Sequence, residues 1–107
     1  MKAKKPDFMT YWKDFMDDWD RANIKPKNIV KIKTERGNMF AMIGYVHVTN
    51  TDHIYTATDF NSGKIIEDSH DIHTLGDKVR SHFIPLINVQ IEHVYSDPFD
   101  WADGLYE

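Results

Sequence analysis

The sequence contains no cysteine. This absence excludes disulfide bonds, zinc–thiolate and iron–sulfur sites, and cysteine nucleophiles. The five glycines are isolated from one another, so the sequence has neither a phosphate-binding loop nor a dinucleotide-binding fingerprint. No apolar run approaches the roughly 18–20 residues that cross a bilayer, and the lysine-rich start does not resemble a signal peptide. We therefore expect a cytoplasmic protein with no membrane partner and no cofactor.

The 107 residues are 41% hydrophobic and 28% charged, which is typical of one folded domain over residues 1–107. Charge is distributed unevenly along the chain. Residues 1–36 hold 10 Lys and Arg against 6 Asp and Glu, whereas residues 37–107 hold 3 against 11, so +4 and −8 sum to the net −4. The acidic total argues against strong non-specific binding of nucleic acid, which needs a row of basic contacts to phosphates.

Two segments have the periodicity of amphipathic helices. Large apolar side chains from Phe8 to Trp19 recur at spacings of four, three and four residues, and Asp7 is placed as an N-cap, which predicts a helix over about 7–23. A second helix is predicted over about 75–84, with Thr74 as its N-cap and Pro85 ending it.

Five segments alternate between apolar and polar residues or are apolar throughout, as β-strands are. They span about 28–35, 39–48, 53–59, 64–68 and 87–95. The segment 39–48 is apolar on both faces, which indicates a central strand. Short turns join the first four strands into a meander. The sequence therefore predicts a single α+β domain with an antiparallel five-stranded sheet and two helices, in the order α-β-β-β-β-α-β, followed by a tail over 96–107.

The tail alternates acidic residues with large aromatic ones, which is typical of segments that dock on another protein. Its candidate partner-binding residues are Phe99, Trp101, Tyr106, Asp97, Asp100 and Asp103. The polar face of the first helix adds Asp14, Asp17 and Asp18. Two interpretations of the tail remain open: it docks on a partner, or it folds back on its own helix or sheet.

A basic segment is the basis of a second hypothesis, nucleic-acid binding. Its cations are Lys25, Lys27, Lys31, Lys33 and Arg36, and Tyr45 and Tyr55 on neighbouring strands are possible stacking platforms. The competing interpretation, which we favour, is that these lysines protect an edge strand from aggregation.

A third hypothesis is a metal-dependent enzyme. Asp68, His70, Asp71 and His73 lie together before the second helix and have the side chains that bind divalent ions. The same pattern is more typical of a solvated loop with helix-capping residues.

None of the serines lies in a nucleophile elbow, and no catalytic motif is present. We therefore expect a non-catalytic protein-interaction module, such as a small inhibitor or adaptor of the phage or bacterial accessory type. Its partner would be another protein with a basic surface, of which the groove of a nucleic-acid enzyme is one example. The sequence also leaves a homodimer open.

Overall fold

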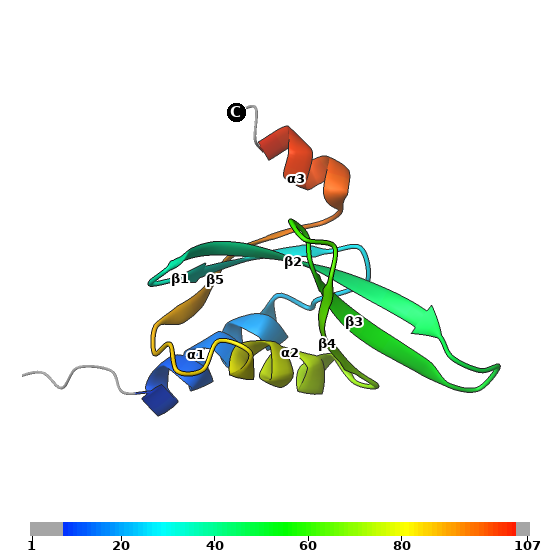
Figure 1. Ribbon diagram of the computed structural model, residues 1–107, viewed down its shortest axis with the longest axis horizontal. Coiled ribbons are helices and arrows are strands. Elements are labelled where there is room, and N and C mark those ends of the chain that lie inside the picture. Colours follow the sequence, from blue (N-terminus) through cyan, green and yellow to red (C-terminus); the bar gives the residue numbers. More distant parts are fainter. Residues whose placement is uncertain (1–7, 105–107) are drawn as a thin grey trace, which may run out of the picture.

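A computed structural model describes residues 8–104 (Figure 1). The elements are α1 (Phe8–Arg21), β1 (Ile29–Thr34), β2 (Gly37–His47), β3 (His53–Asp59), β4 (Ile65–Ser69), α2 (Ile72–Ser81), β5 (Val89–Tyr95) and α3 (Pro98–Gly104). The predicted α+β class and the order of the first seven elements are confirmed, and α3 is an additional helix within the predicted tail. No helix within residues 8–104 is long and apolar enough to cross a membrane.

The strands form one antiparallel sheet in the order β4-β3-β2-β1-β5. The first four follow one another as the predicted meander, and β5 returns to pair with β1. Strand β2 lies between β1 and β3, in agreement with the apolar residues on both of its faces. The pair Val30 and Ala41 lies on one face, here called the inner face, and the neighbouring pair Lys31 and Phe40 lies on the opposite, outer face.

Helices α1 and α2 cover the inner face (Figure 1). The predicted stripe of α1 is buried there at Phe15 and Trp19, and Met16 is buried beside them. These side chains pack with inner-face strand residues such as Ile32 and Ile43 in one hydrophobic core. Helix α1 ends at Arg21, two residues before its predicted end.

Helix α2 begins at Ile72, three residues before its predicted start, because Asp71 and not Thr74 is the N-cap. The Asp71 carboxylate accepts hydrogen bonds from the Thr74 backbone N–H at 2.8 Å and from the Thr74 hydroxyl at 2.9 Å. The backbone hydrogen bond is the main reason why the pKa of Asp71 lies below its ordinary value. The helix ends at Ser81 instead of the predicted position 84.

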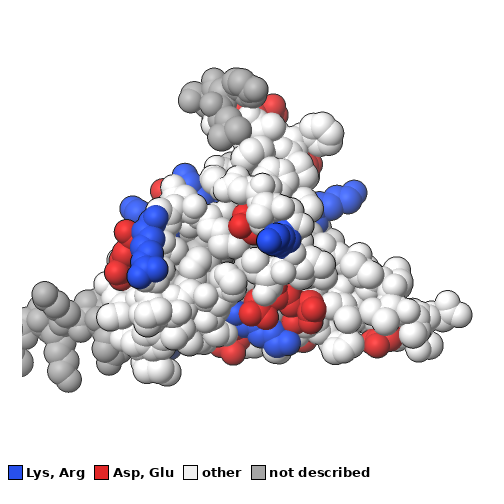
Figure 2. All heavy atoms as spheres, in the orientation of Figure 1, with Lys and Arg blue, Asp and Glu red and all other residues white. Residues whose placement is uncertain are grey.

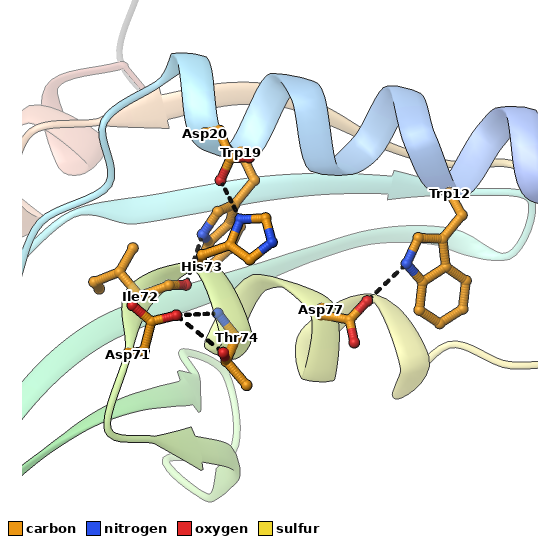
Figure 3. Close-up of polar contacts among 8 residues, drawn as sticks. All are labelled: Trp12, Trp19, Asp20, Asp71, Ile72, His73, Thr74 and Asp77. Atoms are coloured by element: carbon orange, nitrogen blue, oxygen red, sulfur yellow. Dashed lines mark hydrogen bonds and ion pairs between the residues drawn. The ribbon is translucent and has the colours of Figure 1, made fainter.

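Three polar contacts join α1 to α2 (Figure 3). The Trp19 indole donates a hydrogen bond to the Ile72 carbonyl at 3.0 Å. The Trp12 indole donates to the Asp77 carboxylate at 2.8 Å, and His73 Nδ1 lies 2.8 Å from Asp20 Oδ1. These contacts fix the distance between the two helices.

Arg80 is fully buried beneath α1. Its guanidinium carbon lies 5.1 Å from the centroid of the Phe8 ring and 5.0 Å from that of Trp12. Its Nη2 donates to the carbonyls of Leu86 and Ile87, whereas Nε and Nη1 have no hydrogen-bond partner within the described residues. Burial lowers the pKa of Arg80 from its ordinary value. The side chain therefore ties the segment after α2 to the aromatic rings of α1.

Helix α3 lies on the side of the sheet opposite α1 and α2 (Figure 1). The Trp101 ring packs edge-on against Phe40 and Phe60, with ring centroids 5.7 and 4.7 Å away. Part of the tail therefore folds back on the outer face of its own domain.

Candidate interaction site

An open groove of about 370 Å³ lies beside α1, at the side of the helix that faces β5. Positions 11, 14, 17, 18 and 21 share this side because residues three and four apart are neighbours on a helix surface. The groove is lined by Tyr11, Asp14, Phe15, Asp17, Asp18, Arg21 and Gln90. The structure therefore brings the three predicted helix carboxylates together beside an aromatic side chain; we call this set the acidic groove.

Two ion pairs lie along the acidic groove. Lys13 Nζ is 3.0 Å from Asp17 Oδ2, and Arg21 Nη1 is 3.3 Å from Asp18 Oδ1. The hydrogen bond that Lys13 donates to the Asp17 carboxylate raises the pKa of Lys13 above its ordinary value. All four side chains are well exposed to water, where such pairs contribute little to stability. A cationic ligand can therefore displace them at small cost.

At the start of α3, two of the predicted docking carboxylates accept backbone hydrogen bonds. Asp97 accepts a hydrogen bond from the Asp100 backbone N–H at 2.8 Å, and Asp100 accepts one from the Ser96 N–H at 2.9 Å. Asp97 therefore caps the first turn of α3, whereas Asp100 binds the N–H of Ser96, the residue before the cap, and so does not complete a capping box. Asp97 and Asp100 are therefore used within the helix.

The remaining residues of the tail differ in exposure. Trp101 is packed against its own sheet, whereas Phe99 is 82% exposed and Asp103 is also exposed. Tyr106 lies outside the described residues. Because α1 and α3 lie on opposite sides of the sheet (Figure 1), the described residues of the tail and of the first helix do not form one surface.

The basic segment is divided by the fold. Lys31 on the outer face forms an ion pair with Glu92 of β5 at 3.3 Å, and Lys33 shares that face. Tyr45 and Tyr55 pair with each other in the register of Ile43 and Ala57, on the inner face. The proposed stacking platforms and these two lysines therefore point away from each other.

The prediction that the lysines protect an edge strand is also wrong. Strand β1 lies between β2 and β5 and has no free edge. Lys25 and Lys27 line a shallow open groove of about 690 Å³ together with Glu92 and Asp97, so the groove carries both signs of charge. Arg36 lies in the turn between β1 and β2.

The residues of the predicted metal site have separate partners. His70 Nδ1 lies 2.9 Å from the His53 carbonyl and 3.3 Å from Asp52 Oδ1, whereas His73 pairs with Asp20 and Asp71 caps α2. The backbone carbonyl of Asp68 accepts a hydrogen bond from Lys78. Within residues 8–104, no group of three or more His, Cys, Asp or Glu side chains is arranged to hold a metal ion.

The sequence reasoning missed a feature at the far end of β2 and β3. These strands extend past the ends of α1 and α2 (Figure 1), and we call residues 44–56 the hairpin extension. Between Met39 and Thr58 the only Asp, Glu, Lys or Arg is Asp52. Val46 and Val48 are nevertheless 50% and 54% exposed, and the right-hand end of the molecule is nearly free of charge in Figure 2. The lack of charged residues in this stretch is the sequence signal that would have located the hairpin extension.

Comparison with protein-family models, with curated proteins and with solved structures found no match to this chain.

Proposed function

We propose that this chain is a non-catalytic protein-interaction module that binds a basic segment of another protein in the acidic groove. In this proposal it acts in the cytoplasm as a small inhibitor or adaptor of the phage or bacterial accessory type. The basic groove of a nucleic-acid enzyme is one partner surface with suitable chemistry.

The observation that carries the proposal is the grouping of Asp14, Asp17 and Asp18 beside Tyr11 in one open groove. The three carboxylates outnumber the two cations paired with them, Lys13 and Arg21, so the groove keeps a net negative charge. Tyrosine is enriched among the residues that dominate the energy of protein interfaces. Carboxylates around such an anchor accelerate the encounter with a basic partner and select against acidic ones.

The groove also has a rigid support, because α1 is held to the sheet by its buried residues Phe15 and Trp19. The carboxylates are therefore presented at fixed spacing along the helix, and binding does not need to order a loop. A preorganised surface of this kind loses less conformational entropy on association.

Affinity capture tests the proposal. The full chain is immobilised beside two charge-matched variants, and the retained lysate proteins are identified by mass spectrometry. Asp14→Asn with Asp18→Asn removes two groove carboxylates. Glu67→Gln with Asp68→Asn removes two carboxylates on β4, outside the groove, and serves as the control.

We expect a partner with a basic surface that is retained by the wild type and by the β4 variant and is lost from the groove variant. Circular dichroism establishes that all three proteins are folded. Equal retention by the groove variant, or empty captures from all three folded proteins, would contradict the proposal.

A further inference from the structure

The hairpin extension has a free backbone edge along β2. Strand β1 accompanies β2 only as far as Ile43, whose N–H donates to the Asn28 carbonyl at 2.9 Å and whose carbonyl accepts from the Lys27 N–H at 2.7 Å. On the other side, Val48 donates to the Asp52 carbonyl at 3.0 Å within the hairpin. In an antiparallel strand these directions alternate from residue to residue. The backbone N–H and C=O groups of Tyr45 and His47 therefore point toward the β1 side of β2, beyond the point where β1 ends.

The two edge strands of the sheet, β4 and β5, have features that prevent another strand from pairing with them, whereas the free part of β2 does not. Strand β5 has a register shift against β1 and an exposed charge at Glu92, and β4 is five residues long, has a register shift against β3, and carries Glu67 and Asp68. Short strands, bulges and charges are the usual means of preventing edge-to-edge association. Residues 44–48 include no charged residue and no proline. This edge is therefore a template for another strand.

We propose that two copies of this chain pair antiparallel through residues 44–48 of β2, about a twofold axis that passes between the two Val46 residues. In this register Tyr45 of each copy lies opposite His47 of the other. Each such pair exchanges two backbone hydrogen bonds, so the pairing satisfies the outward-directed N–H and C=O groups of both residues in both copies. The two Val46 side chains meet on the outer face, and Tyr45 lies beside His47 of the second copy on the inner face.

A second copy fits this edge for three reasons. The pattern of donors and acceptors is self-complementary, as a twofold interface requires. The joined strips are uncharged, so they approach without the repulsion that two chains of net charge −4 meet elsewhere. Val46 and Val48, about half exposed in one chain, lose contact with water when the strands pair.

The length of the free edge also matches. It runs from the end of the β1 contact at Ile43 to the turn that follows Val48, and five residues of a second β2 fill it. The turn containing Asp52 in one copy then approaches the exposed Lys25 and Lys27 of the other, which gives charges of opposite sign at both ends of the interface. The acidic groove lies beside β5, with β1 between it and this edge, so the dimer leaves the groove open and does not depend on the proposed function.

Sedimentation of the full chain tests the dimer over a roughly hundredfold range of protein concentration. We expect the weight-average mass to rise toward twice the 12.6 kDa of one chain. Val46→Lys places two ammonium groups face to face on the axis and should weaken association at least about tenfold. Ile65→Lys makes the same change at an exposed position on β4 and should leave association unchanged. A wild type that stays monomeric, or a Val46→Lys variant that associates as the wild type does, would overturn the proposal.

A second measurement does not depend on how the lysine variant folds. Because the chain has no cysteine, Val46→Cys introduces one thiol in each copy. The two Val46 residues form a non-hydrogen-bonded pair in the proposed register, and the Cα atoms of such a pair are about 4.5 Å apart, close enough for a disulfide. Mild oxidation should give a disulfide-linked dimer rapidly from Val46→Cys and slowly from Ile65→Cys. Equal rates would refute the twofold register. A monomeric wild type combined with a partner captured by the acidic groove would refute the dimer alone and leave the proposed function standing.

Discussion

Replacement of Gly76 by alanine tests the packing of α2 against α1. Gly76 is buried in α2, and a Cβ atom built on it would lie 2.6 Å from Trp19 Nε1 and 2.7 Å from two other atoms of the same ring. Side-chain carbons do not approach ring atoms this closely. Either the indole or the whole of α2 must therefore move.

Either movement costs free energy of folding. Trp19 is fully buried, and its Nε1–H donates to the Ile72 carbonyl of α2, so the ring is held on both sides. Overpacking of a well-packed core costs about 1–3 kcal/mol, and three contacts below 3 Å place this substitution in the upper part of that range. Alanine recovers about 1 kcal/mol relative to glycine inside a helix. We expect a net loss of about 1–2 kcal/mol, which lowers the melting temperature by about 5–15 °C in a domain of this size.

Urea and thermal unfolding followed by circular dichroism measure this loss. The double variant Gly76→Ala with Trp19→Phe serves as the control, because a smaller ring relieves the contact and the two substitutions should be less destabilising together than their sum. A Gly76→Ala protein as stable as the wild type, or more stable, would refute the packing of α2 on Trp19.

Three further predictions concern other contacts. The hydrogen bond with Asp20 raises the pKa of His73, so the pair contributes stability that is fully present below about pH 6.5 and is lost as the pH rises through the folded-state pKa. We therefore expect His73→Gln to be destabilising only at the acidic end of a series of urea midpoints measured between pH 5.5 and 8.5. Trp101→Ala should cost about 1–3 kcal/mol in thermal unfolding because its ring packs on the outer face, whereas exposed Phe99 should tolerate alanine. Arg80→Met should unfold at higher urea than Arg80→Ala, since methionine fills the space between the aromatic rings without burying a charge; the reverse order would contradict that account.

The local patterns of the sequence predicted most of the fold. The apolar stripe of α1 and the turn residues between the first four strands lie within short stretches of chain, so periodicity was enough to find them. The beginning of α2 was misplaced because Asp71 and Thr74 are both good N-caps, and only the observed hydrogen bond distinguishes them. Helix α3 was missed because its seven residues are too few for a helical period to be recognised.

The long-range relations could not be predicted in the same way. No residue pattern near β1 indicates that β5 pairs with it. Because of this pairing, β1 is an interior strand and not the edge strand that we predicted. Sequence composition likewise does not show that Asp97 and Asp100 accept backbone hydrogen bonds at the start of α3 while Asp14, Asp17 and Asp18 line a groove. The free edge at Tyr45 and His47 follows from where β1 ends, which is a property of the whole sheet.

Calorimetry of the captured partner at low and at high salt shows whether the acidic groove binds a basic segment. If the acidic groove binds a basic segment, the affinity of the wild type falls as salt rises, because salt screens the attraction between exposed charges. The Asp14→Asn, Asp18→Asn variant should bind more weakly at low salt and should lose much of this salt dependence. Equal affinity of the two proteins at both salt concentrations would contradict the account.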